Sequence, residues 1–162
     1  MNSHSTLSAP PEPLLDGSGL TIGILVAHYN WAITGALLQE AQEELLRLNV
    51  KREQMPVVYV PGAYELAFAA QATLRSGRYD ALICFGCVMQ GETRHNVVVS
   101  DAAAQGIQRV ALDAHVPVIF GVMCAQNQLQ AEARIPRGRE YAQAAVEMAQ
   151  LSRLLNKRNV EK

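Results

Sequence analysis

Short runs of apolar residues alternate with amphipathic segments along most of the chain. Residues 20–27 form a nearly continuous apolar run, and similar runs follow at 57–60, 81–85 and 116–123. A run of this kind is typical of a β-strand that is covered on both faces of its sheet. The four runs therefore predict four buried strands.

The segments between and after these runs carry apolar residues every three or four positions. This spacing occurs over residues 33–48, 66–74, 99–114 and 141–155, and it predicts amphipathic helices. A further short helix is predicted within 124–134. Successive strands separated by helical crossovers form parallel sheets, so the pattern predicts a three-layer α/β/α sandwich around a four-stranded parallel sheet.

Length and composition favour one compact domain. The chain has 162 residues, of which 49% are hydrophobic, and a chain of this size buries roughly 70% of its unfolded surface on folding. Residues 1–19 contain three prolines and few apolar positions, too few to offset the entropy of ordering them. We therefore predict a flexible N-terminal arm over 1–19 and a single domain over 20–162.

Charge and cysteine content exclude several classes of protein. The chain carries 14 Lys and Arg against 15 Asp and Glu, which gives no electrostatic reason to expect nucleic acid as a partner. Cys84, Cys87 and Cys124 lie in apolar runs, so we expect buried free thiols and no zinc or redox site. No apolar run is long enough to span a membrane and no signal segment begins the chain. We expect a cytoplasmic protein.

Ligands of parallel sheets bind outside the carboxyl ends of the strands, so the residues just after each run are the candidates for function. Tyr29 and Asn30 follow the first run, where an aromatic ring could stack on a planar heterocycle or simply cover the sheet edge. Glu65 follows Pro61 and Gly62 after the second run. Its carboxylate could accept hydrogen bonds from a polyol or amine, or complement a helix dipole.

The loop after the third run has the features of an anion-binding site. Gly91 allows close backbone approach, Thr93 offers a hydroxyl before a predicted helix, and Arg94 adds positive charge. Backbone N–H groups that lead into a helix N-terminus bind phosphate. His95 is a candidate general base, with a helix cap or surface group as the alternative. Arg134, near the end of the predicted short helix, is either a phosphate ligand or a favourable helix C-terminal charge.

Four of these segments resemble the motifs of the lumazine synthase family, in the family's order and spacing. Tyr29-Asn30 with Ile33-Thr34 resembles its aromatic-Asn-x-x-Ile-Thr segment, and residues 60–65 resemble its Val-Pro-Gly-Ala/Ser-aromatic-Glu. Residues 91–95 resemble Gly-Glu/Ser/Gly-Thr-x-His, and residues 116–122 resemble the strand that follows. Counting without a gap from His95, Arg134 falls on the family's phosphate-binding Arg.

The resemblance implies a flavodoxin-like fold and a transferase of riboflavin biosynthesis. The implied reaction condenses 5-amino-6-ribitylaminouracil with 3,4-dihydroxy-2-butanone 4-phosphate to 6,7-dimethyl-8-ribityllumazine, with no metal and no cofactor. A catalytically weak flavin- or lumazine-binding module on the same scaffold is the alternative. The implied assembly is a homopentamer, with a decamer, a sixty-subunit capsid and contact with riboflavin synthase left open.

The resemblance also assigns roles to individual residues. Tyr29 and a neighbouring subunit's Phe120 would flank the heterocycle, Glu65 would bind the ribityl hydroxyls, and His95 would transfer protons. The full set implied is His95 for catalysis; Tyr29, Asn30, Ala63, Tyr64, Glu65, Val88, Met89, Gln90 and Phe120 for substrate; and Gly91, Glu92, Thr93 and Arg134 for phosphate. Arg137 stands where the family usually has Lys.

The chain departs from the family's pattern at a few positions. Asn96 and Val97 replace an aromatic and an acidic residue after His95, and Gln90 replaces a cation. The loop after Arg134 is several residues shorter than usual. These departures remove a carboxylate that could orient His95, and they are the reason for keeping the binding-module alternative.

Overall fold

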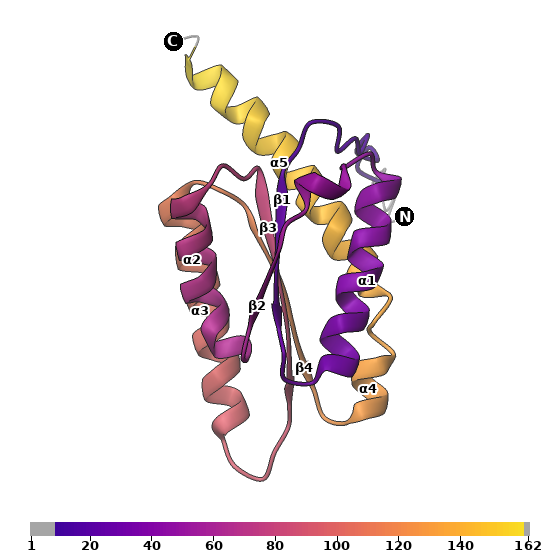
Figure 1. The fold of residues 1–162 in the computed structure, drawn as a ribbon, viewed down its shortest axis with the longest axis vertical. Coiled ribbons are helices and arrows are strands. Elements are labelled where there is room, and N and C mark those ends of the chain that lie inside the picture. Colours follow the sequence, from indigo (N-terminus) through magenta and orange to yellow (C-terminus); the bar gives the residue numbers. More distant parts are fainter. Residues whose placement is uncertain (1–8, 161–162) are drawn as a thin grey trace, which may run out of the picture.

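A computed structural model describes residues 9–160 of the chain. Figure 1 shows three layers, with a parallel sheet between two layers of helices. The sheet contains β1 (Ile22–Ala27), β2 (Val57–Val60), β3 (Ala81–Met89) and β4 (Val118–Ala125). Its strand order is β2-β1-β3-β4, with every pair parallel. The predicted α/β sandwich with a four-stranded parallel sheet is confirmed.

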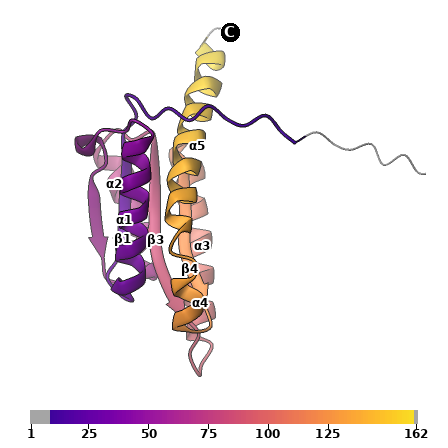
Figure 2. The same cartoon turned by 90° about the vertical axis from the view of Figure 1, so that its right-hand side faces the viewer.

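The helices cover both faces of the sheet. α1 (Trp31–Arg47) and α5 (Arg137–Val160) lie side by side on one face, as Figure 2 shows. α2 (Leu66–Ser76) and α3 (His95–Ala114) cover the other. The short elements are α4 (Gln128–Glu132) and the single-turn 3₁₀ helices η1 (Arg52–Gln54) and η2 (Ala63–Glu65). Among the described helices, none is long and apolar enough to cross a membrane.

The core is divided by the sheet into two clusters. Ile22, Ile24 and Phe85 project towards α1 and α5, whereas Leu25 and Leu82 project towards α2 and α3. Each of these side chains is fully buried. Because successive strand residues point to opposite faces, a run that is apolar at every position fills both clusters. This is why β1 and β3 occupy the middle of the sheet.

Element boundaries differ from the sequence-based ones at the carboxyl end of the sheet. β3 continues to Met89, and β4 runs two residues further than expected, so that Ala125 pairs with Met89. Cys124 is consequently a strand residue, but it is exposed and not buried as predicted. Its neighbours Met123 and Ala125, whose side chains point to the opposite face, are buried, so only the face that carries Cys124 is uncovered at the end of this edge strand.

The segment before β1 is held against the domain from about residue 15. The side chain of Leu15 packs on the core, and the backbone N–H of Gly17 donates to the carbonyl of Leu48 at 2.6 Å. Residues 1–8 of the predicted arm lie outside the described residues. The flexible arm over 1–19 and its boundary at residue 20 stay predictions.

Candidate active site

A cavity of about 590 Å³, which we call the main cavity, lies at the carboxyl ends of β1, β2 and β3. The loops after these three strands and the first turns of α3 form its walls. Its lining residues are Tyr29, Asn30, Gly62, Ala63, Tyr64, Glu65, Cys87, Val88, Met89, Gly91, Thr93, His95, Asn96, Val98 and Val99. A volume of this size accommodates a small organic ligand.

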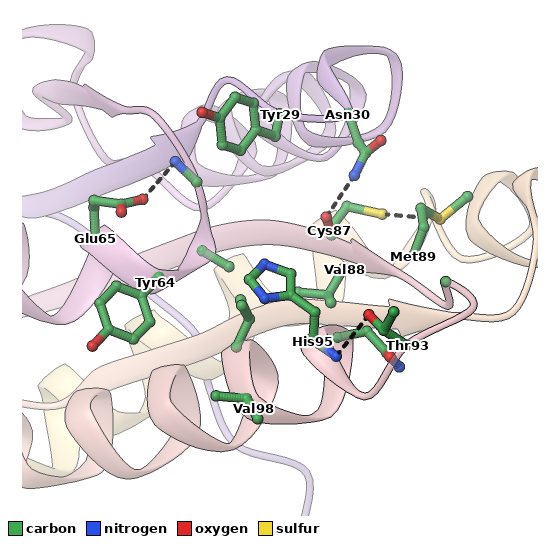
Figure 3. Close-up of a pocket in the computed structure, with 15 residues that line it drawn as sticks. Tyr29, Asn30, Tyr64, Glu65, Cys87, Val88, Met89, Thr93, His95 and Val98 are labelled. Carbon is green, nitrogen blue, oxygen red and sulfur yellow. Dashed lines mark hydrogen bonds between the residues drawn. The ribbon is translucent and has the colours of Figure 1, made fainter.

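Asn30 fixes the wall that follows β1. Its backbone adopts a left-handed conformation, with φ 61° and ψ 44°, which Asn tolerates better than most residues. This geometry directs the side-chain amide to the carbonyl of Cys87 on β3, to which it donates at 2.7 Å. The neighbouring Tyr29 ring is 67% exposed, and Figure 3 shows it above the cavity. An exposed ring at a fixed strand end can stack on a planar ligand.

Glu65 lies in the turn that follows β2. Its Oε2 accepts the backbone N–H of Gly62 at 2.9 Å, which holds the carboxylate at the entrance to α2. No second hydrogen bond to this carboxylate is present among the described residues. One oxygen therefore caps the turn, and the other is available to accept hydrogen bonds from a ligand. Both uses considered from the sequence are compatible with this geometry.

His95 stands at the first position of α3, with its ring in the middle of the cavity residues that Figure 3 draws, between Tyr64 and Val88. Its backbone N–H is 3.4 Å from the hydroxyl oxygen of Thr93. Among the described residues, the imidazole has neither a hydrogen bond nor an ion pair. It is therefore free to exchange protons with a ligand.

Gly91 lies in the exposed loop between β3 and α3. A Cβ atom at this position would meet no other atom within 4 Å, and the backbone of Gly91 has no positive φ. Neither strain nor packing in the described chain thus requires glycine here. The small residue leaves room for a group that approaches the loop from outside.

Several of the predicted site residues do not line the main cavity. Among the described residues that do line it, Glu65 is the one acidic residue and no Lys or Arg is present. Gln90 and Arg134 instead line a smaller polar cavity of about 280 Å³ beside the end of β4. Phe120, 39% exposed, lines an apolar groove of about 530 Å³ between α3 and α5 at the β4 edge.

Glu92 and Arg137 are also absent from the lining of the main cavity. Glu92 is exposed in the loop before α3. The Nε of Arg137 lies 3.3 Å from the carboxylate of Glu140, and its guanidinium carbon lies 5.5 Å from the ring centre of Tyr141. The short connection between α4 and α5 starts the last helix at Arg137, and these contacts direct its side chain along that helix.

Sequence reasoning missed part of the cavity wall. Val98 and Val99 line the cavity three and four residues after His95. Residues at these spacings share one face of a helix. The start of α3 at His95 would therefore have been the signal that identifies both valines. Asn96, noted from the sequence only as a departure, lines the main cavity and the polar cavity.

The buried thiols are poorly suited to nucleophilic chemistry. Burial raises the pKa of Cys84 to about 12, and burial together with the nearby Cys124 raises the pKa of Cys87. Both thiols are therefore protonated near neutral pH. Among the described residues, no group of three or more His, Cys, Asp or Glu side chains is arranged to hold a metal ion.

Comparisons with known proteins agree on one family. A family model described as 6,7-dimethyl-8-ribityllumazine synthase matches residues 19–153. A protein of that name from Burkholderia multivorans is 43% identical over 146 residues, covering 90% of this chain and 85% of the relative. One from Paraburkholderia phymatum is 44% identical over 142 residues, with 87% and 83% covered. One from Thermococcus gammatolerans is 43% identical over 141 residues, with 85% and 90% covered.

Proposed function

Because the chain belongs to the 6,7-dimethyl-8-ribityllumazine synthase family, we propose that the main cavity is the site of its reaction. The chain is a transferase of riboflavin biosynthesis. It condenses 5-amino-6-ribitylaminouracil with 3,4-dihydroxy-2-butanone 4-phosphate and releases inorganic phosphate. The comparisons do not favour the alternative of a binding module without turnover. The observation that carries the proposal is the meeting of Tyr29, Glu65 and His95, from three loops, around one cavity.

The uracil substrate is assigned to the part of the cavity between Tyr29 and Glu65, which Figure 3 draws at the upper left. In our proposal, Tyr29 stacks on the pyrimidine and the free oxygen of Glu65 accepts hydrogen bonds from the ribityl hydroxyls. The backbone at Val88 and Met89 faces the pyrimidine edge. Further wall contacts come from Asn30, Ala63 and Tyr64. The bond from Asn30 to Cys87 supports this arrangement because it fixes the end of β3 against which the ring would lie.

The phosphorylated substrate is assigned to the loop that precedes α3. Backbone donors near Gly91 and the hydroxyl of Thr93 would hold the phosphate at a helix N-terminus. The open space at Gly91 supports this role. His95 lies between this loop and the proposed pyrimidine position, so it can transfer protons during imine formation and phosphate loss. Holding the two substrates in register can supply on the order of 7–11 kcal/mol of the rate enhancement.

A neighbouring subunit would complete the site. The family acts on small molecules and forms oligomers, and a homopentamer is our proposal for this chain. The proposal is supported by the absence of Lys and Arg from the described lining of the main cavity, since a phosphate needs a cation. Arg134 and Phe120, on the β4 side of one subunit, would supply the cation and the second stacking ring to the next. Gln90, Glu92 and Arg137 would contribute substrate contacts at the edge of the completed site.

The direct test is formation of the fluorescent lumazine from the two substrates, followed beside the uncatalysed reaction. We expect acceleration by the wild type and a much smaller acceleration by Arg134→Ala, because the loss of the cation weakens use of the phosphorylated substrate. Tight lumazine binding without any acceleration would overturn the assignment and favour the binding module.

The shared site has a test of its own. His95→Ala and Arg134→Ala subunits, each impaired alone, should gain activity when they are unfolded, mixed and reassembled. Recovery is expected because some interfaces then combine an intact His95 with an intact Arg134. If mixtures are no more active than the separate variants while reassembled wild type is active, the two residues do not meet across an interface. A mass measurement in solution tests the pentamer separately.

A further inference from the structure

The side chain of Gln130 holds the short helix that carries Arg134 to the end of β4. α4 has only five residues, and a helix this short is not stable by itself in water. Its one deeply buried residue is Ala131, which fixes the position of the helix against the core but gives little control over its rotation. The direction of the exposed groups on α4 therefore depends on hydrogen bonds at its ends.

Gln130 takes part in three such bonds. Its Oε1 accepts the backbone N–H of Gln126 at 2.7 Å. Its backbone N–H donates to Oδ1 of Asn127, the N-cap residue, at 2.9 Å. Its backbone carbonyl accepts a bond of 3.0 Å from Nη1 of Arg134. One residue thus connects the strand end, the helix cap and the guanidinium.

The end of β4, beside which the side chain of Gln130 is hydrogen-bonded, is itself held by the sheet. Ala125, the last residue of β4, pairs with Met89, and its carbonyl accepts the backbone N–H of Gln90 at 2.8 Å. Gln126 follows directly. The chain of contacts therefore leads from the rigid sheet through Gln126, the first residue of an exposed bend, and through Gln130 to Arg134.

A long, flexible side chain such as arginine loses substantial entropy when it is fixed on a ligand. A guanidinium that already donates to a carbonyl loses less entropy when it binds the ligand, and it presents its remaining N–H groups in a defined direction. Gln130 and Arg134 line the same polar cavity, so this direction is towards the space beside the end of β4.

We propose that Gln130 is a positioning residue for the reaction: through its bond to Gln126 it sets the direction in which Arg134 presents its guanidinium to the substrate phosphate. The inference rests on the proposed phosphate role of Arg134 and extends it to a residue that touches no substrate. Gln130 should consequently affect the use of the phosphorylated substrate and leave binding of the uracil substrate unchanged.

The test compares the same substitution at two positions of α4. Gln130→Met keeps the length of the side chain but removes its acceptor. Gln128→Met is the matched control, because Gln128 bonds only to Glu132 on the exposed side of the helix. For Gln130→Met we expect the KM for the butanone phosphate to rise about fivefold to tenfold, the effect of one lost hydrogen bond. The KM for the uracil substrate should stay unchanged, and Gln128→Met should match wild type in both.

A second background separates the alternatives. In an Arg134→Ala background, Gln130→Met should have no further effect on this KM. If Arg134→Ala raises the KM but Gln130→Met behaves like Gln128→Met, the inference about Gln130 fails and the phosphate site stands. If Arg134→Ala leaves the KM unchanged, the proposed phosphate role itself fails.

Discussion

Asp80 at the amino end of the sheet and His95 at its carboxyl end differ in whether their side chains are bonded to the protein. At the amino end, Asp80 accepts the backbone N–H of Thr21 at 2.8 Å and Nε of Arg153 at 2.7 Å. Arg153 also donates to the carbonyl of Gly19 at 3.0 Å. At the carboxyl end, the imidazole of His95 has no such partner among the described residues.

This difference separates groups that the fold uses from groups that it leaves for a ligand. The Asp80 cluster ties β1, β3 and α5 together, so its hydrogen-bonding capacity serves stability. A polar group without a protein partner adds nothing to the folded state, and it must bond to water or to substrate. Substitutions in the Asp80 cluster should therefore change stability alone, whereas replacement of the unpaired His95 side chain should change catalysis alone.

The largest effect is expected for His95→Ala. Loss of a positioned general base should lower kcat roughly tenfold to a thousandfold. The midpoint of urea unfolding should stay close to that of wild type, because the ring makes no hydrogen bond or ion pair with the described chain. Steady-state kinetics of lumazine formation and urea unfolding measure the two quantities. Equal turnover by variant and wild type would contradict proton transfer by His95.

Two glycines, Gly121 in β4 and Gly91 in the loop before α3, allow a second comparison of stability with catalysis. A Cβ at Gly121 would lie 2.6 Å from the ring of Phe85 and 2.8 Å from the carbonyl of Cys84. Gly121→Ala should therefore destabilise the domain by about 1–3 kcal/mol through overpacking. Gly91→Ala meets no atom of the described chain, so it should keep wild-type stability while raising the KM for the butanone phosphate. Urea unfolding and steady-state kinetics of both variants test this. A loss of stability in Gly91→Ala would mean that the fold itself requires glycine at this position.

The sequence predicts the arrangement of the sheet well because burial leaves a direct pattern. A strand between two helical layers must be apolar at every position, and β1 and β3 are. The same reasoning located Tyr29, Glu65 and His95, since the carboxyl ends of parallel strands meet at one edge. These three residues do line one cavity, although their roles stay predictions.

The features that the sequence could not predict lie in or directly after β4, which is an edge strand of the sheet. An apolar run does not distinguish a central strand from an edge strand, and for that reason Cys124 was expected to be buried. Nor does spacing along the chain specify on which side of β4 a residue emerges. Phe120 and Arg134 therefore lie outside the main cavity of their own chain, a separation that only the packing of α3, α4 and α5 determines.

A smaller effect, confined to stability, is expected for Asp80→Ala. Asp80 accepts two hydrogen bonds, one of them from a charged but half-exposed Arg153, so its loss should cost about 1–2 kcal/mol. Activity at 25 °C should be unchanged because the cluster lies at the far end of the sheet from the site. Urea unfolding measures the loss, and Arg153→Ala should add little to it in a double variant. A lower kcat in folded Asp80→Ala would show that the two ends are coupled.

The smallest effect concerns a second internally paired carboxylate, Glu44 on α1, which is only 4% exposed. The hydrogen bond from Arg47 lowers its pKa below the ordinary 4.5, with a further contribution from Gln143 on α5. Because the folded state lowers this pKa, the resulting stability is present above pH 4.5 and is lost as the pH falls through the folded value. At pH 7, Glu44→Gln should thus be less stable than wild type, and this loss of stability should be smaller than that of Asp80→Ala. The stability difference between Glu44→Gln and wild type should shrink as the pH falls below about 4.5. Urea unfolding of both proteins between pH 7 and pH 3 measures this, and a difference that stayed constant would mean that Glu44 stabilises the α1 and α5 layer by packing and not by its charge.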